Sequence, residues 1–180
     1  MRKFQAALIA LAATAALAAT TAHADDSDTH GYGSIGYQTG DFGDLGKGLN
    51  AIGVSGALSV WKFVSVEGDL AVGAGNNNTN FFGAPAKVRL ENDIALYGVG
   101  TFPMSKDVDL FARVGFLEGK VKASSPTLAN EQQESGPAIG VGIHYFPNGG
   151  KNGVALEYNY ADLNHNGNAG IAQLSFVHRF

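Results

Sequence analysis

The sequence contains no cysteine, only five prolines and few charged residues, and beyond its first 24 residues no apolar run approaches 18 residues. The absence of cysteine excludes a disulfide framework, a thiolate metal site and cysteine-based catalysis. The lack of a long apolar run, with a mean hydropathy of zero, argues against a helical membrane protein. A length of 180 residues is typical of one domain. Glycine is abundant instead, and its 25 residues have no period of three, which excludes collagen.

The first 24 residues have the layout of a secretory signal peptide. Arg2 and Lys3 form a basic start, residues 6–19 are apolar, and Ala-His-Ala at 22–24 is a small-residue cleavage site. The alternative, an N-terminal anchor helix, would need a longer and more apolar stretch. Cleavage would leave one domain, residues 25–180, which is 156 residues long and has 10 basic against 16 acidic side chains. The formal charge of −4 then becomes −6, so nucleic acid is excluded as a partner.

From Gly31 onward, apolar residues alternate with small or polar ones, and this period of two indicates β-strands. We expect eight strands, near residues 31–40, 48–60, 63–74, 86–102, 107–118, 137–146, 153–162 and 169–180. The connections alternate in length: short at 61–62, 103–106 and 147–152, but longer and polar at 41–47, 76–85, 119–136 and 163–168. Short turns at one end and longer loops at the other are typical of an outer-membrane barrel.

One face of the expected strands is uniformly apolar. Its members are Ile52, Val54, Leu58, Val60, Val64, Val66, Leu70, Val72, Val88, Leu90, Ile94, Leu96, Val108, Leu110, Val114, Phe116, Ile139, Val141, Ile143, Tyr145, Val154, Leu156, Tyr158, Tyr160, Leu174, Phe176 and Phe180. The opposite face is small or polar and takes every charge that the strands carry: Glu67, Asp69, Arg89, Glu91, Asp93, Asp109, Arg113, Glu157 and Arg179.

This distribution distinguishes a membrane barrel from a soluble β-protein. A soluble sandwich or lipocalin would place apolar residues inside and charges outside. Apolar residues outside indicate a lipid surrounding, because a basic side chain at mid-depth on the lipid face costs about 2–4 kcal/mol. An open strand edge in hydrocarbon would leave backbone groups unpaired, so the sheet must close. The predicted fold class is therefore all-β, an eight-stranded antiparallel up-and-down transmembrane β-barrel.

The expected interior holds a charged network at mid-height, formed by Glu67, Asp69, Asp93, Arg113 and Glu157. An eight-stranded barrel is only wide enough for its own side chains, which argues against a general diffusion porin. Buried charges need partners, and a guanidinium can bridge two carboxylates. The acids outnumber the central base, so we expect at least one carboxylate to hold a proton or a cation. Paired carboxylates also occur in glycosidases, but a closed barrel would give a sugar no access.

Two segments resemble a known family. The ending Leu174-Ser175-Phe176-Val177-His178-Arg179-Phe180 is similar to the C-terminal assembly signal of bacterial outer-membrane proteins, which Leu174, Phe176, His178 and Phe180 would form; His178 departs from the usual large apolar residue. Residues 97–103 and 109–116 resemble the central hairpin of small OmpA-like and OmpX-like barrels. The resemblance implies a free-standing barrel inserted by the outer-membrane assembly machinery. It also implies an acid–base network in the lumen, with Arg113 and either Glu67 or Glu157 as the counterpart here.

Other motifs carry no predicted chemistry. Gly31-Tyr32-Gly33-Ser34-Ile35-Gly36 matches a dinucleotide-binding pattern but lies within an alternating strand rather than before a helix. Residues 165–170 are similar to a stretch of the lipid A deacylases, but Gly167 stands where their nucleophilic serine would be, so the histidine has nothing to activate. The histidines have no metal-ligand spacing. We expect no catalytic residue, no metal and no cofactor.

The interpretation that we adopt is a non-enzymatic, monomeric barrel in the outer membrane of a Gram-negative cell, serving envelope integrity and surface contacts. Its partners would be outer-membrane lipid, lipopolysaccharide and, during insertion, the assembly machinery. Residues 119–136 are expected to form a mobile loop in which Lys120 and Lys122 contact lipopolysaccharide phosphates. The alternatives are a narrow pore or carrier for small apolar molecules or ions, as in OmpW-like barrels, and a lipid A-modifying enzyme.

Overall fold

The computed structural model describes residues 31–43, 46–81, 84–124, 129–164 and 167–180, so the expected signal peptide lies outside the described residues. Nine strand segments follow one another in the chain. They are β1 Gly31–Phe42, β2 Gly46–Trp61, β3 Val64–Gly73, β4 Asn77–Phe81, β5 Ala84–Pro103, β6 Val108–Ser124, β7 Ala129–Tyr145, β8 Asn152–Leu163 and β9 Gly167–Arg179; a 3₁₀ turn, η2 Pro147–Gly149, precedes β8. Among the described residues, no helix is both long and apolar enough to cross a membrane.

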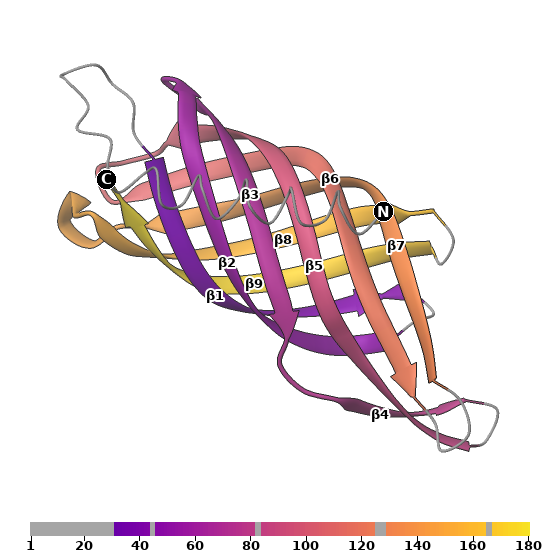
Figure 1. The fold of residues 1–180 in the computed structure, drawn as a ribbon. Coiled ribbons are helices and arrows are strands. Elements are labelled where there is room, and N and C mark those ends of the chain that lie inside the picture. The colour runs from indigo at the N-terminus through magenta and orange to yellow at the C-terminus, as the bar shows by residue number, and fades with distance from the viewer. Residues whose placement is uncertain (1–30, 44–45, 82–83, 125–128, 165–166) are drawn as a thin grey trace.

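The strands close into one antiparallel barrel. Each barrel strand pairs with its neighbours in the chain, and β1 pairs with β9 to complete the ring. The short β4 continues the course of β3 along β5: Val72 pairs with Asn92, and Asn77 then pairs with Val88. Nine segments therefore make eight barrel strands, and the predicted fold is confirmed. Figure 1 shows β4 and the adjoining ends of β5 and β6 projecting beyond the rest of the barrel wall.

The two faces of the wall differ as the alternation predicts. On β6, Val114 is 64% exposed, whereas Arg113, its neighbour in the chain, is 5% exposed. On β8, Leu156 and Tyr158 point outward and flank Glu157, which is buried. An outer surface this rich in exposed large apolar side chains is expected where lipid, rather than water, is the solvent.

The predicted faces are wrong at one place, in β5. Val88 and Leu90 are buried in the barrel interior, whereas Arg89 and Glu91, expected inside, lie on the outer face. The pairing of β5 with β6 shifts between Leu90 and Asn92, so Glu91 is the extra residue of a β-bulge. A bulge reverses the face to which the following residues point. The strand therefore turns Leu90 and Asp93 to the same side of the wall.

The segment expected as a mobile loop at 119–136 is also different in the structure. β6 and β7 stay paired as far as Ser124 and Ala129, so Lys120 and Lys122 belong to a strand. The short strand β4 and the adjoining ends of β5, β6 and β7 together form an extension of the barrel. An apolar cluster, to which Val88, Leu90, Leu117 and Val121 contribute, lies inside this extension. The extension is thus built like a soluble β-protein, apolar inside and charged outside, because water surrounds this end of the barrel. Polar composition alone suggested a loop, but the inward-facing residues supply enough burial to keep the strands paired.

Candidate functional site

The charged network of the interior is built around Arg113 of β6. Strand alternation turns Arg113 inward, and Gly140 stands opposite it on β7. A Cβ atom at Gly140 would lie 3.1 Å from Cγ of Arg113 and would overlap the Asn159 side chain. The glycine therefore leaves the room that the arginine stem and Asn159 occupy. This is one position where the abundance of glycine serves the site directly.

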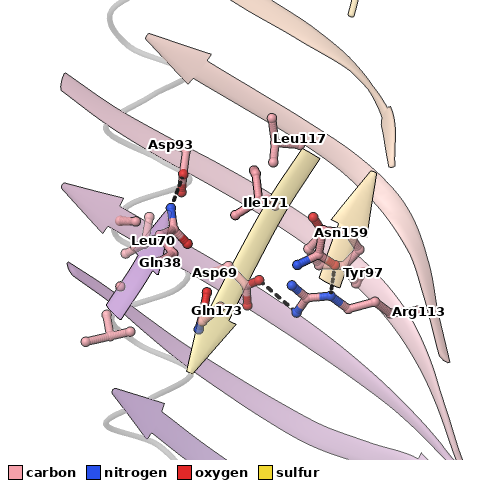
Figure 2. Close-up of a pocket in the computed structure, with 14 residues that line it drawn as sticks. Gln38, Asp69, Leu70, Asp93, Tyr97, Arg113, Leu117, Asn159, Ile171 and Gln173 are labelled. Carbon is pink, nitrogen blue, oxygen red and sulfur yellow. Dashed lines mark hydrogen bonds and ion pairs between the residues drawn. The ribbon is translucent and has the colours of Figure 1, made fainter. Parts of the chain in front are cut away.

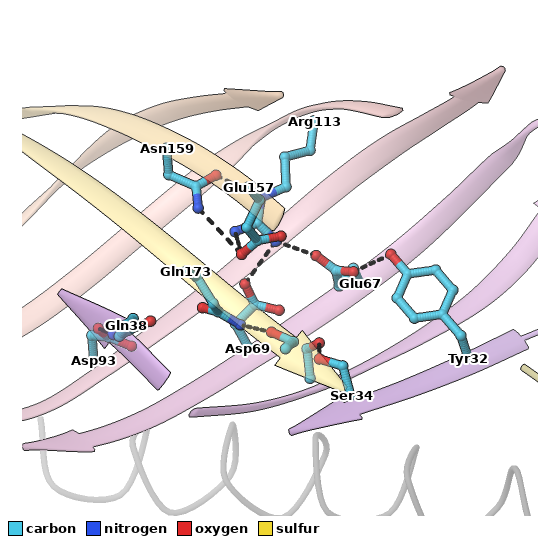
Figure 3. Close-up of polar contacts among 12 residues, drawn as sticks. Tyr32, Ser34, Gln38, Glu67, Asp69, Asp93, Arg113, Glu157, Asn159 and Gln173 are labelled. Carbon is cyan, nitrogen blue, oxygen red and sulfur yellow. Dashed lines mark hydrogen bonds and ion pairs between the residues drawn. The ribbon is translucent and has the colours of Figure 1, made fainter. Parts of the chain in front are cut away.

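The Arg113 guanidinium donates four hydrogen bonds to side chains of the interior. Nη2 donates to Glu157 at 2.8 Å, Nη1 donates to Asp69 at 3.0 Å and also to Glu67, and Nε donates to Oδ1 of Asn159 at 2.7 Å (Figure 3). The guanidinium carbon lies 4.2 Å from the ring centre of Tyr97, over its face. Carboxylates from β3 and β8 are thereby tied to β6 across the lumen. The structure thus brings Arg113 together with Glu67, Asp69 and Glu157.

An aromatic layer lies next to the network on the side of the short turns. Tyr32 donates its hydroxyl hydrogen to Glu67 and packs edge-on against His144, with ring centroids 5.2 Å apart. His144 stacks on Phe111, with centroids 4.5 Å apart and an interplanar angle of 27°. Phe146 also packs edge-on against His144, with centroids 5.7 Å apart, and the guanidinium of Arg179 lies over the Phe146 ring. The ionic network thus continues into packed rings toward the end of the barrel that carries the short turns.

Asp93 lies apart from the Arg113 cluster. Its Oδ2 atom accepts a hydrogen bond of 2.5 Å from Nε2 of Gln38 on β1, and it makes no direct ion pair with Arg113. Between the two lies a cavity of about 20 Å³, which is room for about one water molecule. Gln38, Asp69, Asp93, Asn159 and Gln173 line it (Figure 2). Oδ1 of Asp69 is buried there without a hydrogen-bond partner among the described residues.

The neutral members of this network were missed by reasoning from the sequence. Gln38, Asn159 and Tyr32 carry no charge, so a search for ion pairs passes over them. All three nevertheless occupy inward positions of the same alternation, and Asn159 follows Glu157 by two residues on β8. The alternation therefore contained enough information to find them.

The other predicted site residues lie on the outer face. Leu174, Phe176 and Phe180 are exposed, and His178, between the last two, bonds through Nδ1 with Oδ1 of Asn152 at 2.7 Å. This arrangement keeps the expected assembly signal as one continuous stripe at the end of β9.

Lys120 and Lys122 point outward from β6 above the apolar band, and both are engaged by carboxylates. Lys120 Nζ lies 2.9 Å from Glu131 and 3.2 Å from Glu91, and Lys122 Nζ lies 2.8 Å from Glu131. Hydrogen bonds from Lys122 and Lys120 lower the pKa of Glu131 to about 2. A phosphate that approaches these lysines therefore competes with two carboxylates of the same chain.

Among the described residues, no group of three or more histidine, aspartate or glutamate side chains is arranged to hold a metal ion. His165, the histidine of the deacylase-like stretch, lies outside the described residues.

Comparison with known proteins assigns the family. The model of the outer membrane protein beta-barrel domain matches residues 8–180. The chain belongs to this family. No protein of curated function matches its sequence. The barrel is similar to solved structures of Ail, the attachment invasion locus protein of Yersinia pestis, one of them in complex with the heparin analogue sucrose octasulfate (TM-score 0.63, 19% identity, 86% of this chain and 100% of that chain).

Two further solved structures are similar to the barrel of this chain. One is the N-terminal β-barrel domain of Pseudomonas aeruginosa OprF, with a TM-score of 0.60 and 12% identity over 86% of this chain and 98% of that chain. The other is Neisserial surface protein A, with a TM-score of 0.55 and 14% identity over 85% of this chain and 96% of that chain. At these identities, the likeness shows the fold alone. The family match and this fold together identify the chain as a barrel of the OmpA-like and OmpX-like type, located in the outer membrane.

Proposed function

We propose that this barrel is non-enzymatic, that its lumen is closed by the Arg113 network, and that it serves envelope integrity and contacts at the cell surface. The observation that carries the proposal is the extension formed by β4, β5, β6 and β7. It has an apolar interior and a charged outer wall, so it holds its shape outside the membrane. A rigid, charged surface of this kind suits contacts with other molecules better than a flexible loop, because less conformational entropy is lost on binding.

The edge of β7 supports the same proposal. Residues 129–137 of β7 pair with β6 on one side, but pairing with β8 on the other side begins only at Ala138 with Ala161. Asn164 donates its backbone N–H to the carbonyl of Ser135 at 3.2 Å. Beyond Ser135, the described residues offer no strand to this edge. An open edge can accept an extended segment of a partner.

We further propose that Lys120 and Lys122, with Arg89 beside them, contact phosphates of lipopolysaccharide at the outer surface. They face outward immediately above the apolar band that ends at Phe116, where such phosphates lie. The competition from Glu91 and Glu131 makes this contact weak for each lysine alone. We infer, in addition, that the barrel acts as a monomer, that export uses residues 1–24, and that residues 174–180 direct insertion by the assembly machinery.

The surface role is tested by shortening the extension. In the test variant, residues 120–133 are replaced by an Asn-Gly turn between Gly119 and Glu134, which pair in the intact barrel. The barrel should still fold, as shown by different migration of boiled and unboiled samples in a gel. Cells that carry it should adhere less to protein-coated surfaces than cells with the intact barrel. Equal adhesion by the two, with equal amounts of folded protein, would contradict the surface role.

The closed lumen is tested by conductance in planar bilayers. The folded barrel should give no reproducible channels, because the Arg113 network crosses the lumen and the cavity beside it has room for about one water. Reproducible channels from the folded protein would favour the narrow pore instead. Altered acylation of lipid from producing cells would favour the lipid-modifying enzyme.

A further inference from the structure

The outer wall of the barrel is hollowed along β9 at the end that carries the longer connections. Two successive outward positions of β9, Gly170 and Ala172, have little or no side chain. They pair with Asp41 and Thr39 of β1 on one side, and with Tyr160 and Tyr158 of β8 on the other. Adjacent strands lie about 4.8 Å apart, so the walls of the hollow stand roughly 9.6 Å from each other.

This hollow is a groove of ligand size. Its volume is about 440 Å³, within the range of about 300–1,000 Å³ that is usual for small-molecule sites. The phenol of Tyr158 leans over its floor: a Cβ atom at Gly170 would come within 2.5 Å of the Tyr158 hydroxyl. The glycine therefore makes room for the ring, and one tyrosine hydroxyl is held inside the groove.

The groove changes in polarity along its length. Its lower end continues into an apolar row in which Leu174 stands between Tyr37 and Leu156 on the lipid face. Its upper end is lined by Asp41, Lys47 and Asn168. An occupant must therefore be apolar at one end and polar at the other. Its apolar part would lie in the membrane and its headgroup at the outer surface.

The charges at the upper end favour one kind of headgroup. Asp41 accepts a hydrogen bond of 2.7 Å from the backbone N–H of Gly48, which holds the start of β2 beside the groove. Among the described residues, no carboxylate forms an ion pair with Lys47, in contrast to Lys120 and Lys122. Lys47 can thus meet a phosphate, while the second oxygen of Asp41 and the amide of Asn168 can meet hydroxyl groups.

We propose that this groove binds an outer-leaflet glycolipid, with one acyl chain laid over Ala172 beside the Tyr158 ring and a phosphorylated sugar at Lys47, Asp41 and Asn168. A phosphorylated sugar supplies the anion and the hydroxyl groups that this set matches. A simple anionic phospholipid would instead bring its phosphate beside Asp41 with fewer hydroxyl groups to compensate. The proposal rests on the outer-membrane setting but not on adhesion by the extension, which lies on other strands.

Native mass spectrometry of the folded full-length barrel in detergent can test this site. The probe is a diphosphorylated, acylated glucosamine disaccharide, compared with its dephosphorylated form and with phosphatidylglycerol. We expect one tightly bound probe molecule per barrel. Ala172→Leu fills the floor and should weaken binding about tenfold. The control Ala112→Leu makes the same change at an exposed, lipid-facing position of β6 and should leave binding unchanged.

Lys47→Gln supplies the second arm of the test. It should weaken binding of the diphosphorylated probe but not of the dephosphorylated one, whereas Lys87→Gln, at another exposed lysine, should affect neither. Equal binding by Ala172→Leu and Ala112→Leu, or phosphatidylglycerol bound as tightly as the glycolipid, would overturn the proposal. All variants are first checked for heat-dependent migration, so loss of folding is recognised separately. Loss of adhesion on shortening the extension is measured on the barrel with an intact groove, so the two proposals can fail independently.

Discussion

Replacing Arg113 with methionine should destabilise the barrel strongly. The substitution keeps an unbranched side chain of similar length but removes hydrogen bonds to Glu67, Asp69 and Glu157. The side chains of Arg113 and Glu67 are each 3% exposed and that of Glu157 is 8% exposed, so water cannot take over as partner. Removing one member of a buried ion pair costs about 3–5 kcal/mol, because the remaining charge is left without compensation. For a chain of this size, that corresponds to a fall in Tm of roughly 6–20 °C.

The measurement is urea unfolding of the barrel in lipid vesicles, followed by tryptophan fluorescence of Trp61. Arg89→Met is the matched control, because Arg89 is half exposed and pairs with Glu91 at 3.6 Å on the outer wall. Its loss should cost less than about 1 kcal/mol. Adding Glu67→Gln to Arg113→Met should recover part of the stability, since one uncompensated charge is removed. If Arg113→Met costs no more than Arg89→Met, the network does not hold the strands together and the reasoning is refuted.

Three further predictions follow from the outer face and the extension. Glu131 should titrate with a midpoint near 2, because hydrogen bonds from Lys122 and Lys120 lower its pKa from 4.5. Its contribution to stability is therefore present above pH 4.5 and is lost as the pH falls from 4.5 toward 2. Carboxyl NMR of the wild type checks the midpoint, which Lys122→Gln should shift upward. Leu90→Ala should cost about 2–5 kcal/mol in urea unfolding because Leu90 is buried in the extension; no loss of stability would show that the extension has no packed interior. Deleting Phe180 should reduce insertion in cells while Phe63→Ala, at an exposed aromatic of the same end, should not; normal assembly without Phe180 would count against the terminal signal.

The sequence alone predicts the barrel well because a single physical rule runs through most of it. A period of two, with apolar residues on one face and the charges of the membrane-spanning part on the other, has one satisfactory arrangement in lipid. The central ion cluster follows from the same rule, since Arg113 is a lone base facing several acids. The height of each residue is harder to predict, because it depends on the stagger between strands. Asp93 was expected beside Arg113 for this reason, but it pairs with Gln38 instead.

The extension was missed because the rule reverses where the strands leave the membrane. The rule that apolar residues face lipid predicts an outward Leu90, but at the level of Leu90 the barrel is surrounded by water. A sign of this reversal stood in the sequence. Glu118, Lys120 and Lys122 continue the outward positions of Val114 and Phe116 on β6. Charges in register with the lipid face mark the level at which that face leaves the lipid.

The bulge at Glu91 lies where these two arrangements meet. Within the membrane, an apolar interior would not determine which face of a strand points inward, because the lipid outside is as apolar as a core inside. The ions around Arg113 determine it, since a register slip would turn them into hydrocarbon. Above the membrane, water supplies the preference, and burial of Leu90 and Val121 is enough. A strand that serves both regions must change which face is apolar. The extra residue in β5 accomplishes this in one step. Deleting Glu91 should therefore disorder the extension, seen as faster amide hydrogen exchange at Val121, while amides around Arg113 stay protected; equal protection of both regions would show that the bulge does not set the change of face.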